Sequence, residues 1–278
     1  MTTPSTEAVH TAHDTPLPFL RLPMPTVPFG QHDGCATDGA DHVVVPIPRL
    51  RHSEQSRAWF RWLLGHHLSV GVWRLQIEQL TTALDPRIDP EDAAKAQYAA
   101  AALYDIYSAL LLYSGSCTQA VYADVIRARL KARHPAFSGT WARDYEHVLG
   151  LSRQLTGPTT TFKRAVRFDR HVHMAVGRRL VPAGKSLLRE TGGDPRATTE
   201  EDRDRFDEFF LISREPVCDN TFTQQLTDRI QLALDDIATV PVTVDYGDDE
   251  DINRLQADIP AQLETLSSMV SGRKVYLS

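Results

Sequence analysis

The residues of this chain best suited to chemistry are histidines that lie inside apolar helical patterns. His66 and His67 stand in LLGHHLSVGVWRLQIEQL, and Trp73 follows six residues after His67. A neutral imidazole can bind iron or transfer a proton, and facing helices can enclose a flat macrocycle. Gly65 costs a helix about 1 kcal/mol relative to alanine, which indicates that a large group approaches the backbone here. The alternative is that one histidine caps a helix and the other packs in the core.

A second histidine pair lies in FKRAVRFDRHVHMAVGRRLV. His173 shares one helical stripe with four apolar residues, Phe162, Val166, Val176 and Leu180. Asp169 is the polar member of that stripe and the nearest side chain in sequence that could orient a ligating imidazole. His171 lies on a more polar, arginine-rich face. His173 is therefore the better candidate for a heme ligand, and the alternatives are His171 or a histidine that only packs in the core.

Two further segments could bind a small polar ligand. In YSGSCTQAVYADVIRARLKAR, a turn of small residues precedes a helix that carries Tyr122 and Arg127. Arg127 could bind a substrate carboxylate, and the backbone N–H groups of Gly192 and Gly193 could form a nest for an anion. The alternatives are a solvated, charged helix and a loop that merely connects two helices.

These residues must be positioned by helices, because the chain shows an all-α pattern. We expect a bundle of about six to eight helices over one catalytic domain, residues 53–278. The helices predicted are, by residue number, 53–84, 91–113, 118–134, 138–155, 160–188, 199–212, 220–238 and 251–270. The segment TVPVTVDY, residues 239–246, is the one predicted strand. Residues 1–52 hold eight of the 17 prolines and form an N-terminal arm. Within the arm, residues 17–29 are apolar, which favours packing across the body over binding a partner as a polyproline ligand.

Composition and motifs exclude several other classes of protein. No dinucleotide or phosphate-binding glycine loop, nucleophile elbow, HExxH or paired ExxH pattern is present. Three widely spaced cysteines argue against a disulfide framework, a zinc finger or a c-type heme site. Cys218 offers a thiolate-ligated heme as a rival arrangement. The net charge of −6 disfavours nucleic acid, and no run is apolar enough for a membrane span or a secretory signal, so we expect a cytoplasmic protein.

The histidine segments resemble a known family. The stretch from His67 to Leu80 is similar to the distal-histidine helix of tryptophan 2,3-dioxygenases, roughly H-Q-A-Y-E-L-W-F-K-Q-I-L. Arg170–His173, with Arg179 six residues on, resembles that family's axial-ligand helix, and S-G-S-C-T-Q-A-V-Y resembles its S-G-F-Q-S-x-Q-F-R segment. The arginine that grips the substrate carboxylate is replaced, and the family's glycine loop is shortened. The chain is therefore most similar to the smaller histidine-ligated aromatic oxygenases, and above all to bacterial heme-dependent L-tyrosine 3-hydroxylases, which share its length and a proline-rich start.

This resemblance implies an enzyme that binds heme b non-covalently and uses hydrogen peroxide to convert L-tyrosine into L-DOPA in a natural-product pathway. It implies a homo-oligomer, a dimer, whose partner is a small aromatic amino-acid substrate, L-tyrosine, and which binds neither nucleic acid nor a membrane. His67 would be the catalytic residue, and His173 would bind iron. The other residues that the resemblance implicates are Trp73, Arg170 and Arg179 around the heme, and Tyr122, Arg127, Gly192 and Gly193 around the substrate. The alternatives are an oxygenase acting on tryptophan or a methylated tryptophan, and a helical binding protein without catalytic activity.

Overall fold

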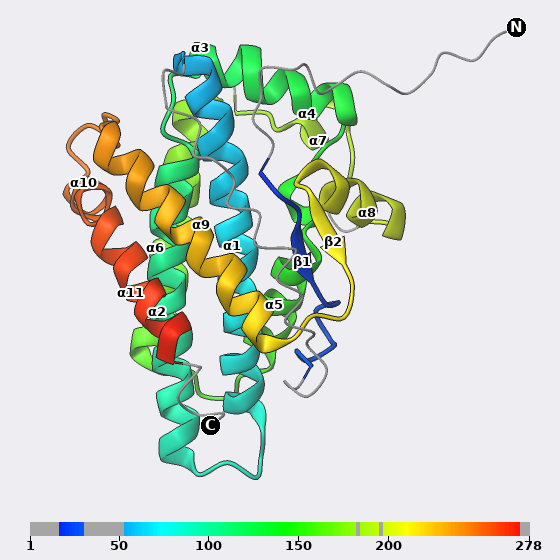
Figure 1. Ribbon diagram of the computed structural model, residues 1–278, viewed down its shortest axis with the longest axis vertical. Helices are drawn as coiled ribbons and strands as arrows, with labels where there is room; N and C mark the ends of the chain where they lie inside the picture. Colours follow the sequence, from blue (N-terminus) through cyan, green and yellow to red (C-terminus); the bar gives the residue numbers. More distant parts are fainter. Residues whose placement is uncertain (1–16, 31–52, 182–183, 195–196, 273–278) are drawn as a thin grey trace, which may run out of the picture.

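A computed structural model describes residues 17–30, 53–181, 184–194 and 197–272 of the chain, and it confirms the all-α fold (Figure 1). The long helices are α1 (Glu54–Leu84), α2 (Pro90–Ser114), α5 (Arg143–Gln154), α6 (Thr160–Leu180), α8 (Glu200–Phe209), α9 (Asp219–Thr239), α10 (Glu250–Ala257) and α11 (Ile259–Gly272). The short elements are β1 (Leu20–Leu22), α3 (Gln119–Val121), the π-helical segment η2 (Tyr122–Arg127), α4 (Ala128–Arg133), the 3₁₀ turn η3 (Gly139–Trp141), α7 (Leu187–Glu190) and β2 (Ile212–Arg214).

Helix starts follow the capping residues that the sequence indicates. Ser53 accepts a hydrogen bond from the backbone of Ser56 at the start of α1, and Asp89 caps α2 ahead of Pro90. Thr199 opens α8 with a complete capping box, in which Asp202 is the acidic partner. Polar groups at these ends satisfy backbone donors that a helix leaves open, so α1, α2 and α8 begin within one residue of their predicted positions, whereas α5 begins at Arg143, five residues later than predicted.

The centre of the molecule is α2, which packs against both α1 and α6. Small residues let these helices approach closely. A Cβ at Gly65 would lie 2.0 Å from Ser114 Oγ, and one at Gly115 would lie 2.7 Å from Val176 Cγ1. The group that approaches the backbone at Gly65 is therefore helix α2, not a cofactor as the sequence suggested.

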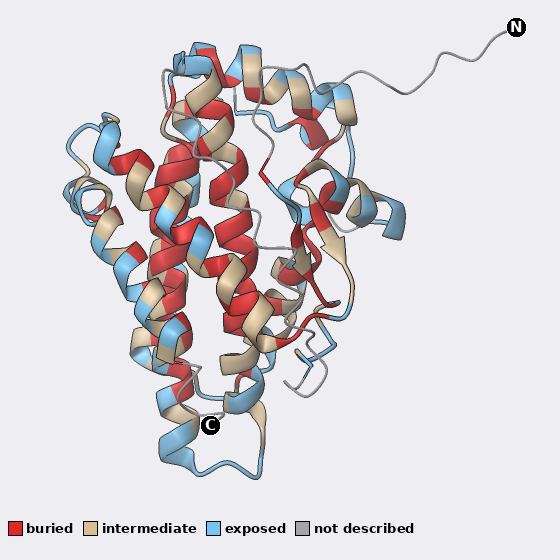
Figure 2. Ribbon diagram, viewed as in Figure 1, coloured by how far each residue is buried: buried red, intermediate tan, exposed pale blue. Residues whose placement is uncertain are grey.

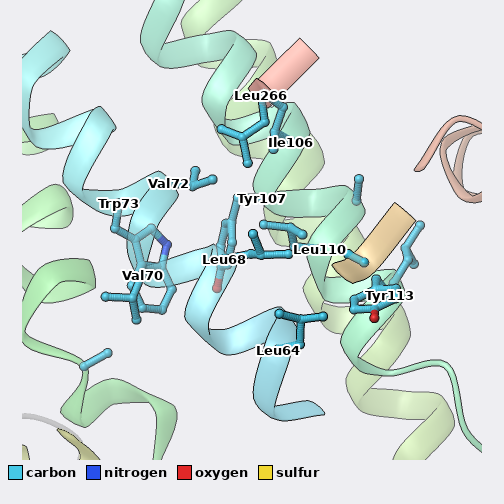
Figure 3. Close-up of a cluster of buried hydrophobic side chains, with 14 of the residues drawn as sticks. Leu64, Leu68, Val70, Val72, Trp73, Ile106, Tyr107, Leu110, Tyr113 and Leu266 are labelled. Carbon is cyan, nitrogen blue, oxygen red and sulfur yellow. The ribbon is translucent and has the colours of Figure 1, made fainter. Parts of the chain in front are cut away.

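The interior between α1 and α2 is apolar and aromatic. Figure 3 shows Leu64, Leu68 and Trp73 of α1 facing Tyr107 and Leu110 of α2, and all of these residues are buried. Buried residues lie on the facing sides of the long helices, whereas many residues of the outer helices α10 and α8 are exposed or intermediate (Figure 2). Several polar side chains of α1, among them His67 and Arg74, are buried in this core. They therefore need hydrogen-bond partners inside the protein.

The N-terminal segment packs across the body, as its apolar residues predicted. Residues Leu20–Leu22 pair in parallel with Ile212–Arg214 to form a two-stranded sheet. Buried arginines donate to carbonyls of this segment: Arg74 to Met24, Pro25 and Val27, and Arg229 to Pro18 and Phe19. Proline-rich backbone leaves many carbonyls unused by secondary structure, and these satisfy the guanidinium groups.

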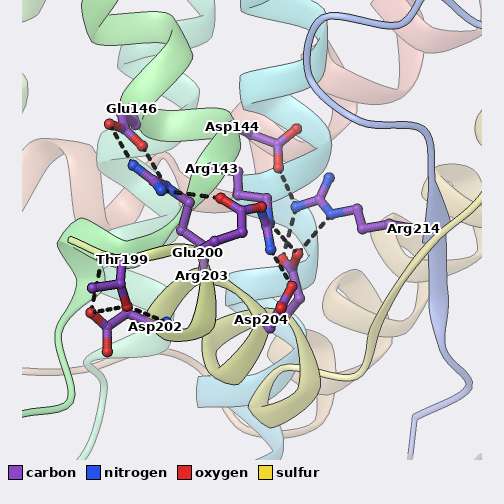
Figure 4. Close-up of polar contacts among 10 residues, drawn as sticks. Arg143, Asp144, Glu146, Thr199, Glu200, Asp202, Arg203, Asp204 and Arg214 are labelled. Carbon is purple, nitrogen blue, oxygen red and sulfur yellow. Dashed lines mark hydrogen bonds and ion pairs between the residues drawn. The ribbon is translucent and has the colours of Figure 1, made fainter.

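A cluster of ion pairs joins α5, α8 and β2 (Figure 4). Arg214 donates to Asp144 at 2.6 Å and to both oxygens of Asp207, and Arg143 binds Asp207 from the other side at 2.9 Å. These carboxylates are almost fully buried. Because each buried carboxylate faces a guanidinium, the ion pairs offset the desolvation cost of the buried charges. The cluster thereby holds β2 against α5 and α8.

Three sequence predictions about the elements are wrong. Residues 239–246 form no strand, because the described chain offers them no neighbouring strand; the side chain of Gln256 instead binds the N–H and C=O of Val244. The helix predicted to continue to residue 188 ends at Leu180, and α7 is separate. The last predicted helix is divided at Asp258, ahead of Pro260, because proline cannot continue the hydrogen bonding of α10.

No helix among the described residues combines the length and apolar character that crossing a bilayer requires. The division into an arm (1–52) and a single catalytic domain (53–278) stays a prediction.

Candidate functional site

His67 lies in the core with both ring nitrogens bonded. Nε2 is 2.5 Å from the carbonyl oxygen of Phe210, and Nδ1 accepts a hydrogen bond from Arg229 Nε at 3.0 Å. Since Arg229 can only donate, the proton of the neutral ring must be on Nε2. Burial and the nearby guanidinium lower the pKa of His67 well below its usual value. The turn that presents the Phe210 carbonyl continues into Leu211 with φ of 53°, a rare conformation for a branched residue.

His66, the neighbouring residue, lies on another side of α1 and is bonded through one nitrogen only. Its Nδ1 is 2.7 Å from the carbonyl oxygen of Trp62, so this nitrogen carries the proton. Its ring stacks on the Phe210 ring at 4.1 Å and lies 4.6 Å from the Trp62 ring. Burial lowers the pKa of His66 to about 4. Within the described residues Nε2 has no hydrogen-bond partner, so its lone pair is left for a ligand or a proton.

Trp62 adds an unpaired donor at the same place. Its indole Nε1 is buried and has no hydrogen-bond partner in the part of the chain that the structure describes. The Trp62 ring meets the Tyr122 ring edge-on at 5.7 Å. A buried N–H without an acceptor is costly, so natural proteins rarely leave one unless a water or a ligand completes it. Trp62, His66 and Tyr122 therefore form an aromatic wall with one open donor and one open acceptor.

The π-helical segment brings two predicted substrate residues together. Tyr122 and Arg127 are its first and last residues. In an α-helix residues five apart point roughly 140° away from each other, whereas a π-helix bonds residue i to i+5 and aligns them on one face. The Arg127 charge acts to lower the pKa of the Tyr122 hydroxyl, although burial has the larger effect and the pKa is raised.

Arg127 reaches from this segment to the end of α7. Its Nη2 donates to Glu190 Oε1 at 2.7 Å and to the Lys185 carbonyl at 3.1 Å. The N–H groups of Gly192 and Gly193 donate to carbonyls of Arg189 and Leu188, so they cap α7 and do not form the predicted anion nest. A φ of 70° at Gly192 makes this tight turn possible and fixes Glu190 beside Arg127.

The histidines of α6 are exposed, although His173 shares its stripe with the buried Val176 and Leu180. His171 Nε2 contacts Asp249 Oδ2 at 2.7 Å, so this nitrogen already has a partner. Desolvation lowers the pKa of His173 even though water reaches its side chain. Asp169 does not orient His173 as expected; its oxygen lies 3.4 Å from Ser108 Oγ on α2.

Asp169 is buried, and no basic side chain among the described residues forms an ion pair with it. Burial raises its pKa to about 7, and the hydrogen bond from Ser108 lowers it only in part. Its carboxyl helps to raise the pKa of Tyr107 and of Tyr145. The rings of both tyrosines pack against Trp73 at about 5 Å. The predicted heme residue Trp73 therefore belongs to this interior aromatic group, and its buried Nε1 also lacks a partner.

The two predicted propionate residues differ in their surroundings. Arg170 is exposed on α6. Arg179 donates to the carbonyls of Gly115 and Cys117, and its guanidinium lies 5.3 Å from the Tyr246 ring. It thereby ties the end of α6 to the turn after α2. Cys218 is disulfide-bonded, which the low cysteine count did not predict, so it supplies no thiolate for iron.

The structure thus groups the candidates in a way that the sequence did not show. Arg127 meets Glu190 just ahead of the Gly192–Gly193 turn. Tyr122, on the same π-helical segment as Arg127, packs against Trp62, which contacts His66. His67 and His173 do not face one another, because α2 packs against α1 on one side and α6 on another. Sequence reasoning missed Trp62 and Glu190. The i, i+4 spacing of Trp62 and His66 could have revealed the first, but nothing in the sequence links Glu190 to Arg127.

Comparison with known families identifies the class of enzyme. Residues 6–171, more than half of the chain, match the family model described as SfmD 3-methyl-L-tyrosine peroxygenase. The matched region contains the aromatic wall and Arg127 but ends before His173 and Arg179. No curated protein matches the chain significantly.

Proposed function

Because the chain belongs to the SfmD 3-methyl-L-tyrosine peroxygenase family, and so is a peroxygenase enzyme acting on a tyrosine-like substrate, we propose that it hydroxylates L-tyrosine at ring carbon 3 to give L-DOPA. The oxidant in this proposal is hydrogen peroxide, the cofactor is heme b, and the setting is a natural-product pathway. The observation that carries the proposal is the pair of open groups on the aromatic wall: the buried Trp62 Nε1–H without an acceptor and the His66 Nε2 lone pair.

A phenol matches these two groups in a way that an indole does not. Its hydroxyl donates one hydrogen bond, to His66 Nε2, and accepts another, from Trp62 Nε1–H. An indole N–H can only donate, so it would leave Trp62 unpaired. A site built around a hydroxyl rejects an analogue that lacks it by a large factor, because buried polar groups stay unpaired. This ranks L-tyrosine above L-phenylalanine and above tryptophan or a methylated tryptophan.

The cofactor in this proposal is a histidine-ligated heme. We propose that His173 holds the iron, since no described partner occupies its ring, whereas His171 is engaged with Asp249. Heme iron would supply the oxidising chemistry that the side chains of this chain cannot provide. Arg170 and Arg179 stay the candidates for its propionates.

The proton-handling residue that we propose is His66. The sequence assigned this role to His67, but both nitrogens of His67 hold hydrogen bonds in the core. His66 is neutral at pH 7, keeps its protonated Nδ1 on the Trp62 carbonyl, and presents Nε2 as a base. It can take the phenolic proton at Nε2 and return it later, which is the usual action of a general base held in one tautomer.

The test is a spectrum and a product. Protein expressed with heme supply should be coloured and show the Soret band of a histidine-ligated ferric heme. With peroxide it should convert L-tyrosine into a catechol, detected by mass spectrometry, and should leave L-phenylalanine unchanged. A preference for 3-methyl-L-tyrosine would change the substrate but keep the reaction. Colourless protein, or hydroxylation of tryptophan with tyrosine untouched, would contradict the proposal. The cytoplasmic location and the homodimer stay part of the proposal.

A further inference from the structure

The pair formed by Arg127 and Glu190 has charges that match both ionic groups of a free amino acid. The guanidinium and the carboxylate are 2.7 Å apart, and their side chains are 18% and 43% exposed. Two different elements hold them in place: the π-helical segment turns Arg127 onto the Tyr122 face, and the glycine turn fixes Glu190 at the end of α7. Both charges therefore lie at the outer end of the aromatic wall.

We propose that Arg127 and Glu190 act as a clamp for the amino-acid zwitterion, in which Arg127 takes the α-carboxylate and Glu190 takes the α-ammonium. This inference rests on the proposed function and deepens it by naming what makes the enzyme specific for an amino acid. Glu190 is the new specificity-determining residue.

Charge balance supports the exchange of partners. In the free protein the two charges neutralise each other. When a zwitterion enters, its carboxylate replaces the Glu190 carboxylate on Arg127, and its ammonium group replaces the Arg127 guanidinium on Glu190. Each charge keeps an opposite partner, so no net charge is added. Charge-assisted hydrogen bonds of this kind are stronger than neutral ones, and a guanidinium suits a carboxylate in geometry as well as in charge. The Lys185 carbonyl holds Arg127 at 3.1 Å while its partner changes.

The order of burial supports the direction in which the substrate lies. Glu190 is the most exposed member, Arg127 is less exposed, Tyr122 is 9% exposed, and the Trp62 N–H is buried. An aromatic amino acid has the same order, from a charged end to an apolar ring. Its ring would lie along Tyr122 and Trp62, and its hydroxyl would reach the open groups of Trp62 and His66.

The experiment measures equilibrium binding of three ligands by calorimetry: L-tyrosine, tyramine, which lacks the carboxylate, and 3-(4-hydroxyphenyl)propionate, which lacks the ammonium group. In Glu190→Gln we expect L-tyrosine and tyramine to bind roughly 10- to 100-fold more weakly, while the propionate binds at least as tightly as before, because Arg127 no longer has to leave Glu190. In Arg127→Gln, L-tyrosine and the propionate should bind more weakly, while tyramine binds at least as tightly as before.

The matched control is the pair of Arg203 and Glu146, which has a similar distance of 2.9 Å and similar exposure. Arg203→Gln and Glu146→Gln should change none of the three affinities. Equal loss for all three ligands in both test variants, or no loss, would mean that the pair only ties α7 to η2 and would overturn the clamp. Catechol formation by the wild type is measured alongside: its absence contradicts the proposed function, whereas its presence without the crossed pattern contradicts the clamp alone.

Discussion

His66 and His67 are neighbours in sequence and both contact Phe210, yet they differ in what they leave open. His67 binds the Phe210 carbonyl and Arg229 and keeps no free nitrogen. His66 stacks on the Phe210 ring, binds the Trp62 carbonyl, and keeps Nε2 free of described partners. A buried polar residue whose bonds are complete stabilises the fold, whereas one beside an unpaired donor marks a place for a ligand. We therefore assign a structural role to His67 and a role in substrate binding and proton transfer to His66.

The largest expected effect is on the His67 face. His67→Ala should lower the free energy of unfolding by about 4 kcal/mol, because it removes a buried ring and leaves the Arg229 guanidinium and the Phe210 carbonyl without a partner. His66→Ala should cost only about 1 kcal/mol, mainly in lost ring stacking. Urea denaturation of both variants measures the difference. Equal losses would remove the distinction between the two faces.

The second prediction concerns the pH dependence of stability. The lowered pKa of His66 should change the free energy of unfolding by up to about 3 kcal/mol. The folded ring titrates at about 4 and the unfolded ring at 6.5, so unfolding takes up a proton in this range and stability rises from pH 4 to 6.5. Asp169 acts in the opposite sense, because its folded pKa of about 7 makes stability fall from about pH 4 to 7.

The rise should therefore be visible in Asp169→Asn, where the opposing carboxyl is gone, and should become smaller when His66→Gln is added. Melting temperatures between pH 4 and 7 measure both slopes. A flat profile in Asp169→Asn would show that neither histidine is held neutral.

Gly65→Ala tests what approaches α1 beside the histidines. The new Cβ would meet Ser114 at 2.0 Å, and we expect a loss of about 2 kcal/mol from overpacking. Adding Ser114→Gly should restore most of the stability. Heme and ligand affinity should be normal in the double variant. Affinity that stays lost after the packing is relieved would indicate that a bound group, and not α2, needs the glycine.

The smallest effect on stability is expected at Trp62. Trp62→Phe removes an unpaired N–H, so the free energy of unfolding should change by less than about 1 kcal/mol, while L-tyrosine should bind about 2- to 10-fold more weakly. Trp73→Phe is the control, since its Nε1 is also buried and unpaired but lies in the interior aromatic group. If the two variants weakened tyrosine binding equally, the phenol ring of the substrate would not lie beside Trp62 as proposed.

Much of the fold could be predicted because it depends on local signals. Caps such as Ser53 and Thr199, and breaks such as Asp89-Pro90, act within a few residues. The strands could not be predicted, because Leu20 and Ile212 pair across most of the chain. The π-helical turn at Tyr122–Arg127 was also invisible, since it differs from an α-helix only in backbone hydrogen bonding.

The candidate site was predictable in its residue types but not in its partners. Periodicity and the family resemblance pointed to the histidine pair of α1, and to Tyr122 and Arg127. Whether His66 or His67 is saturated depends on Phe210 and Arg229, which are far away in sequence. The partner of Arg127 is Glu190, and a contact between residues so far apart in the chain leaves no pattern in a single sequence.

The most direct test of the account is the fate of labelled oxygen in three proteins: wild type, His66→Gln and His67→Gln, each heme-loaded and shown to be folded. L-tyrosine is treated with isotopically labelled hydrogen peroxide under ordinary air, and the catechol is analysed by mass spectrometry. We expect the wild-type product to carry one labelled oxygen, His66→Gln to lose roughly 100-fold or more in rate, and His67→Gln to keep most of its rate per folded molecule. Unlabelled product, or loss of rate in His67→Gln with His66→Gln unaffected, would contradict the account.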